Sequence, residues 1–113
     1  MRRIISGLVA ILAVQTGAQA ADRNATAAIV AGDLPQAERI LTTERRIFPN
    51  RPELMLNLAA VYRQTGREAE ANALYASVLR RPAALMDLPD QQIVSSHVLA
   101  QAGLQKSTQI ASR

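Results

Sequence analysis

The sequence of 113 residues contains no cysteine and very few aromatic residues. Without cysteine the chain cannot form a disulfide, and a zinc site built on thiolates is excluded. The aromatic side chains are Phe48, Tyr62 and Tyr75, whereas alanine and leucine supply much of the apolar content. A β-sandwich needs many aromatic and β-branched residues, so this composition favours α-helices that pack closely through small side chains.

The sequence also lacks a strong excess of one charge. Lysine and arginine number 13 against 9 acidic residues. Arg2 and Arg3 lie in a segment that we predict to be removed, and without them 11 basic residues face 9 acidic ones. This near balance argues against nucleic acid as the main partner. Apolar residues make up 49% of the chain, which is typical of one small folded domain rather than a disordered segment.

The first twenty residues have the layout of a secretory signal peptide. Arg2 and Arg3 are followed by an apolar run of eleven residues, Ile4 to Val14, and then by a small, polar stretch that ends "AQA" at Ala20. The run is too short for a membrane span, which needs about 20 residues. We therefore predict cleavage after Ala20 and export to a bacterial periplasm, or secretion if the source is eukaryotic. An uncleaved anchor and a buried first helix are the alternatives.

The remaining chain contains an internal repeat. Gly32 and Gly66 are 34 residues apart, Ala37 aligns with Ala71, and Leu41 aligns with Tyr75. Self-similarity at this fixed period indicates a helical repeat. Each unit is predicted to be a helix, a glycine turn and a second helix that runs back, because glycine readily adopts the left-handed conformation that ends a helix.

Caps and apolar spacing predict where the helices lie. Asp33 is predicted to cap a helix that begins near Leu34, and Asn50 to cap one near Pro52, with Glu53 reaching back in a capping box. Apolar residues at helical spacing predict the second helices of the two units over 34–48 and 67–80. The helix between them, from Pro52, is apolar almost all round and is expected to be an inner helix.

The sequence after Arg81 departs from the period. Residues 82–90, "PAALMDLPD", are predicted to be a long connection. The apolar residues from Ile93 to Leu99 predict another helix that ends at "AQAGL", either the first helix of a third unit or a terminal cap. The tail 105–113 is polar and is expected to fray. The predicted organisation is therefore a signal peptide over 1–20, a repeat domain over 21–104 and this tail.

These residues resemble a tetratricopeptide repeat. The resemblance covers residues 52–81 and, less fully, 22–51, with Glu44 and Met55 departing from the usual pattern. It implies an all-α fold, a short right-handed α-solenoid of antiparallel helix hairpins with about two and a half units. The structural positions that carry the resemblance are Gly32, Ala37, Leu41, Leu58, Ala59, Tyr62, Gly66, Ala71, Tyr75 and Val78.

Residues suited to catalysis are scarce. His97 is the one histidine, and on a helix it lies at the edge of the apolar face, where a packing role is expected. The neighbouring Ser95 and Ser96 would not face it, because adjacent side chains on a helix point in different directions. No phosphate loop, zinc-binding helix or calcium loop is present, so we expect no catalytic residue, cofactor or metal.

The resemblance to the repeat family implies binding of a protein or peptide on the concave side. The groove would be lined by Glu53, Asn57, Ala60, Arg63 and Gln64. An ordinary solvated helix face is the alternative interpretation of this stripe. Three functions follow: a non-enzymatic interaction module for an unidentified protein or peptide, a protein that pairs with itself through open ends near Leu85, Met86 and Leu88, and, less favoured, an enzyme that uses His97.

Overall fold

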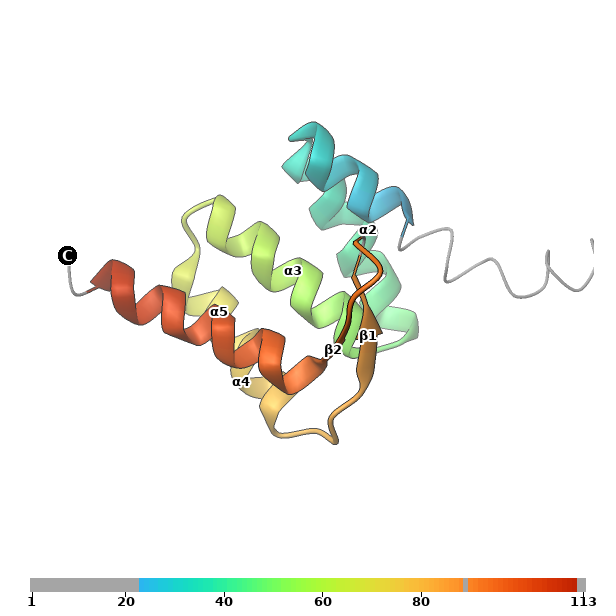
Figure 1. Cartoon of the computed structure of the whole chain (residues 1–113). Helices are drawn as coiled ribbons and strands as arrows, with labels where there is room; N and C mark the ends of the chain where they lie inside the picture. The colour runs from blue at the N-terminus through green and yellow to red at the C-terminus, as the bar shows by residue number, and fades with distance from the viewer. Residues whose placement is uncertain (1–22, 89, 112–113) are drawn as a thin grey trace, which may run out of the picture.

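The computed structural model describes residues 23–88 and 90–111, with side chains up to Lys106. The predicted signal peptide, residues 1–20, lies outside the described residues. The described part is mostly helical, as the composition predicts, and successive helices alternate in direction (Figure 1). The elements are a helical segment over 23–31, α2 (Leu34–Ile47), α3 (Pro52–Gln64), α4 (Glu68–Leu79), β1 (Leu85–Asp87), β2 (Ile93–Ser95) and α5 (Ser96–Ala111).

The two predicted glycine turns are confirmed. Gly32 and Gly66 have φ values of +79° and +80°, in the left-handed region that favours glycine. The residue after each glycine, Asp33 or Arg67, donates its N–H to the carbonyl five residues earlier, at 2.8 Å in both cases. Each glycine donates its own N–H to the carbonyl three residues earlier. The same C-terminal cap therefore occurs twice, 34 residues apart.

Of the two helix N-caps predicted from the sequence, the structure confirms one and contradicts the other. Asp33 caps α2 as predicted, because its Oδ1 accepts a hydrogen bond from the N–H of Gln36 at 3.4 Å. The predicted cap at Asn50 is wrong, since the residue before α3 is Arg51 and makes no side-chain cap. Glu53 instead accepts a hydrogen bond from Arg51 Nε at 3.1 Å. The Glu53 carboxylate therefore binds the Arg51 guanidinium and does not form the predicted capping box.

The core is centred on α3, which packs against α2, α4 and α5. This confirms that α3 is the inner helix. Small residues let the helices approach closely: Ala25 and Ala59 are fully buried and lie 34 residues apart, so the period extends into segment 23–31. The predicted repeat positions Ala37, Leu41 and Ala71 are also fully buried. The buried residues of α3 are Leu54, Met55, Leu56, Leu58, Ala59 and Val61.

The prediction of a helix that begins at Ile93 is wrong, because residues 93–95 form β2. This strand pairs antiparallel with β1, with Met86 opposite Val94. Ser96 closes the base of the hairpin: its N–H donates to the Ala84 carbonyl at 2.7 Å, and its Oγ accepts from the Ala84 N–H at 2.9 Å. β-branched residues suit a strand once a partner is present, and this tertiary pairing overrides the helix-like spacing.

The predicted end of the last helix is also wrong, since α5 continues to Ala111 and includes most of the tail that we expected to fray. Gly103 lies inside α5 and is not the turn of a third unit. The ring of Tyr75 packs against it, and a Cβ on Gly103 would lie 2.6 Å from the ring atoms Cε1 and Cε2. Among the described residues, no helix combines the length and the apolar character that crossing a membrane requires.

The glycine turns make a direct test of the fold. Gly66→Ala is expected to lower the free energy of unfolding by about 1–2 kcal/mol, the cost of a left-handed conformation for an ordinary residue. No atom lies within 4 Å of the added Cβ, so backbone strain is the whole effect. Urea denaturation measures it. Gly66→Asn is the control and should lose less, since asparagine tolerates this conformation; equal stability of wild type and Gly66→Ala would contradict the turn.

Candidate functional site

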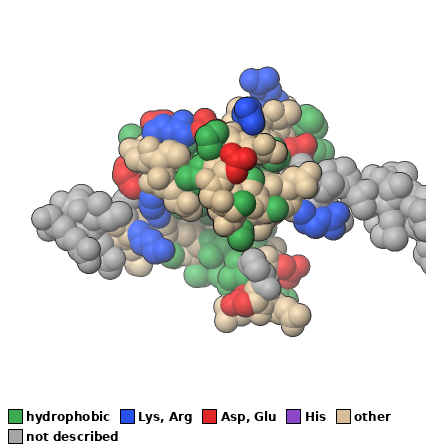
Figure 2. All heavy atoms as spheres, turned by 90° about the horizontal axis from the view of Figure 1, so that it is seen from above, with side chains coloured by type: hydrophobic (Ala, Val, Ile, Leu, Met, Phe, Trp, Pro, Cys, Tyr) green, Lys and Arg blue, Asp and Glu red, His purple; other side chains and the backbone are tan. Residues whose placement is uncertain are grey.

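A hollow of about 370 Å³ lies where four parts of the chain meet. Segment 23–31 contributes Thr26, α3 contributes its N-terminal half, the hairpin contributes β1 and the following residue, and α5 contributes Leu99. Figure 2 shows the molecule from above Figure 1, with hydrophobic side chains and charged groups interspersed on that face. The lining residues are Thr26, Glu53, Leu56, Asn57, Met86, Asp87, Leu88 and Leu99.

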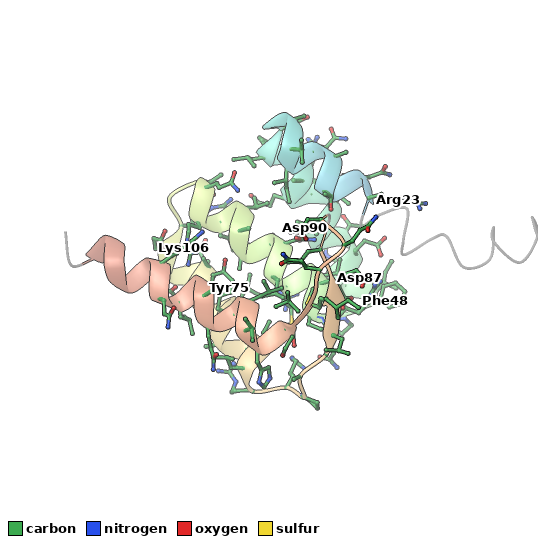
Figure 3. The ribbon with its side chains drawn as sticks, in the orientation of Figure 1. Arg23, Phe48, Tyr75, Asp87, Asp90 and Lys106 are labelled. Carbon is green, nitrogen blue, oxygen red and sulfur yellow. The ribbon has the colours of Figure 1, made fainter. Side chains whose placement is uncertain are left out.

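The hollow has an apolar floor and a polar rim. Leu56 is buried, and Met86 and Leu99 are half-buried residues packed against the core. Glu53 brings a carboxylate, Asp87 of β1 also borders the hollow, and no lysine or arginine is among the lining residues. The Glu53 carboxylate is paired with Arg51, as described above. Asp87 lies on the hairpin, like Asp90 (Figure 3), and its side chain is exposed. A few polar groups around an apolar floor are typical of binding sites.

The structure brings together only part of the groove predicted from the sequence. Glu53 and Asn57 line the hollow, whereas Ala60, Arg63 and Gln64 do not. Gln64 is exposed at the end of α3, and Ala60 is half-buried outside the hollow. The hairpin and α5 also contribute to the hollow, through Met86, Asp87, Leu88 and Leu99, and the predicted groove contains none of these residues.

Arg63 does not line the hollow and instead contacts two neighbouring helices. Its Nη2 donates a hydrogen bond to the Gly103 carbonyl of α5, and its Nε lies 3.6 Å from Glu68 of α4. The guanidinium also stacks over the ring of Tyr75, 4.9 Å from the centroid. With its side chain only 16% exposed, Arg63 joins three helices and is not available to a ligand.

Tyr75 belongs to the same packing cluster, beside α5 (Figure 3). It is 6% exposed, and burial raises the pKa of its hydroxyl above the ordinary value, while the Arg63 guanidinium opposes that shift. The ring fills the space that a side chain at position 103 would occupy. Tyr75 therefore determines how closely α4 and α5 approach.

A second arginine joins α2 and α4. Arg67, at the start of α4, donates two hydrogen bonds to the Glu38 carboxylate of α2 and stacks over Tyr62 at 4.5 Å. The hydrogen bonds from Arg67 lower the pKa of Glu38 below its ordinary value of 4.5. Because neither residue lines the hollow, this pair contributes to the scaffold.

His97 is bound to the backbone. Its Nε2 lies 2.7 Å from the Arg81 carbonyl oxygen, and since a carbonyl oxygen only accepts, Nε2 carries the proton. Its own N–H donates to Ser95 Oγ at 3.2 Å, while Ser96 is fully buried and bonded to Ala84. These contacts place all three residues in the junction between α4, the hairpin and α5.

Other depressions fit a ligand less well than the hollow. One of them, about 470 Å³, is lined by residues of α2 alone, so its wall is a single helix face. Within the described ranges, no group of three or more histidine, cysteine or acidic side chains lies close enough to hold a metal ion. No protein-family model, curated protein or solved structure matches the chain.

The contact between Gly103 and Tyr75 predicts an inverted mutational effect. In an ordinary helix, Gly→Ala stabilises by about 1 kcal/mol. Here Gly103→Ala is expected to destabilise by about 1–3 kcal/mol, because the new methyl group overlaps the Tyr75 ring. Thermal unfolding measures the change. In the Tyr75→Leu background, where the ring is absent, the same substitution should cost less; an equal cost in both backgrounds would exclude the overlap as its cause.

The Glu38–Arg67 pair predicts a dependence on pH. The pKa of Glu38 is lower in the folded state than its ordinary value, so the ionised carboxylate stabilises the fold above pH 4.5. This contribution is lost as the pH falls through the folded-state pKa. The stability advantage of wild type over Glu38→Gln should therefore be present at neutral pH and disappear on acidification, as measured by urea denaturation. Glu44→Gln, which removes another α2 carboxylate, is the control; an identical pH profile for both variants would contradict the assignment.

Proposed function

We propose that this chain is a non-enzymatic protein-interaction module, exported to the periplasm or secreted, that binds a segment of a partner protein in the hollow. One observation carries the proposal: four segments far apart in the sequence converge on one concavity with an apolar floor and a polar rim. Sites of this type are common where structural elements meet. The volume of about 370 Å³ suits a few side chains of a partner better than a large cofactor.

We further propose that the scaffold is a short tetratricopeptide-like solenoid. Its first helices would be segment 23–31, α3 and α5, and its second helices α2 and α4. The repeated glycine cap and the equivalent buried alanines, Ala25 and Ala59, support this assignment. In helical arrays of this kind the concave surface is the binding surface. Each proposed first helix contributes at least one residue to the hollow, which agrees with such an arrangement.

The chemistry of the hollow favours binding over catalysis. Its polar side chains include the Glu53 carboxylate, which is already paired with Arg51, an amide from Asn57 and a hydroxyl from Thr26. His97, the residue on which an enzymatic function would depend, is not among the lining residues and uses Nε2 to bind the Arg81 carbonyl. A general base must reach the proton that it removes, and His97 does not line the hollow.

Self-association is the second candidate function, and the hairpin favours it. Leu85 and Ile93 are 78% and 65% exposed. The register pairs Leu85 with Ser95 and Asp87 with Ile93, so both apolar side chains lie on the same outward face. An exposed apolar pair of this kind can become part of an interface.

Photo-crosslinking in intact cells that export the full chain tests the proposed site. A photoreactive residue in place of Asn57 is expected to crosslink a partner, whereas one in place of Arg39, on the exposed face of α2, is not. Thr26→Arg, which places a long side chain in the hollow, should lower the yield by about tenfold. Ala27→Arg is the matched control, because Ala27 is equally exposed but does not line the hollow. Equal yields from Thr26→Arg and Ala27→Arg would exclude the hollow.

A further inference from the structure

The outer edge of β1 has unpaired backbone groups at known positions. The hydrogen bonds at the two ends of the hairpin join Ala84 to Ser96 and Leu88 to Gln92. Bonded pairs alternate along an antiparallel ladder, so Met86 and Val94 form the bonded pair between them. The N–H and C=O groups of Leu85 and Asp87 therefore point away from β2, along the open edge of the sheet.

This edge borders the hollow. The hollow contacts Met86, Asp87 and Leu88, which are consecutive in the chain. Because side chains alternate between the two faces of a strand, a cavity on one face alone would contact every second residue. A cavity that contacts three in succession must reach the edge of the strand. No residue of β2 lines the hollow, so the edge concerned is the one that β2 does not cover.

We propose that the β1 edge binds an extended segment of a partner protein, which adds a third strand to the hairpin. The inference rests on the proposed function and states how the partner is held. Backbone hydrogen bonds to Leu85 and Asp87 would hold the segment, and its alternate side chains would enter the hollow. Leu85 and Asp87 are both exposed, so an incoming strand can reach these groups.

The register specifies the chemistry of that segment. Residues opposite each other in a sheet share a face. The side chain opposite Met86 faces the core with it and is apolar, since Leu56, Leu88 and Leu99 line the hollow. The side chain opposite Asp87 faces outward and is lysine or arginine, because Asp87 forms no ion pair within the described part of the chain. The segment therefore alternates apolar and basic residues.

A second copy of the chain is a poorer occupant of this edge. Antiparallel pairing of two β1 strands about Met86 would place Asp87 opposite Leu85, with no cation on either strand. Charge complementarity therefore favours a foreign basic segment.

The test uses the full chain and a short synthetic peptide in which valine and lysine alternate. Leu85→Pro removes an outward N–H from the β1 edge, and Ile93→Pro removes one from the β2 edge. Both replace an exposed apolar residue of the same hairpin, so they form a matched pair. Affinity is measured by NMR titration, with the amide spectrum of each free variant as the check on folding. We expect Leu85→Pro to weaken binding about tenfold and Ile93→Pro to leave it within twofold of wild type.

Each outcome has a definite meaning. Equal affinities for the two proline variants, or equal binding of a peptide with glutamate in place of lysine, would overturn the inference. In that case the Thr26→Arg variant separates the two proposals. If Thr26→Arg abolishes peptide binding, the hollow binds the peptide without strand addition and the proposed function stands. If Thr26→Arg leaves peptide binding unchanged, the proposed function and the strand-addition inference are both wrong. Analytical sedimentation of the free chain measures whether it forms a dimer. If it does, and if Leu85→Pro makes the dimer dissociate, then the β1 edge binds a second copy of the chain and the inference is overturned.

Discussion

The burial of α3 on three sides is the constraint on which the rest of the molecule depends. Leu54, Met55, Leu58 and Val61 are almost completely buried, and each such side chain stabilises the fold by about 1.5–3 kcal/mol. Exposed ion pairs contribute much less, with a typical upper value of about 1 kcal/mol. Because α2, α4 and α5 all pack against α3, only a narrow stripe of it stays accessible. Glu53 and Asn57 lie on that stripe, and this is why the hollow forms over the N-terminal half of the helix.

Three arginines contact aromatic rings at or near the boundaries between these helices. Each aromatic residue of the chain has a guanidinium over its ring: Arg51 over Phe48, Arg63 over Tyr75 and Arg67 over Tyr62, at 5.6, 4.9 and 4.5 Å. Two of these arginines also bond to a neighbouring helix, since Arg63 reaches Gly103 and Arg67 reaches Glu38. Such contacts contribute roughly 0.5–1 kcal/mol at exposed sites and more when desolvated. These three positive charges are therefore engaged within the fold.

The sequence was informative where local rules decide the structure. The glycine turns, the inner helix and the buried alanines follow from a fixed period and from the conformational freedom of glycine, so they were predictable. The hairpin was not, because Ile93 and Val94 become a strand only through pairing with residues that precede them by several positions and through the Ala84–Ser96 hydrogen bonds. Likewise, the groove that the resemblance implies includes Glu53 and Asn57, which line the hollow, and Arg63, which does not. The partner of Arg63, Gly103, lies 40 residues later in α5, and no property of α3 alone indicates that contact.

The hairpin between α4 and α5 is one continuous stretch of sequence, closed at its base by the reciprocal hydrogen bonds between Ala84 and Ser96. Met86 of β1 packs against the core, whereas Leu85, Asp87 and Ile93 are exposed. If a partner binds at the hairpin as we propose, part of the contact surface lies in one continuous segment between Ala84 and Ser96, and the rest lies on the helices that line the hollow. Exchanging that segment would then change the hairpin's part of the surface while the contacts of α3 with α2 and α4 stay in place.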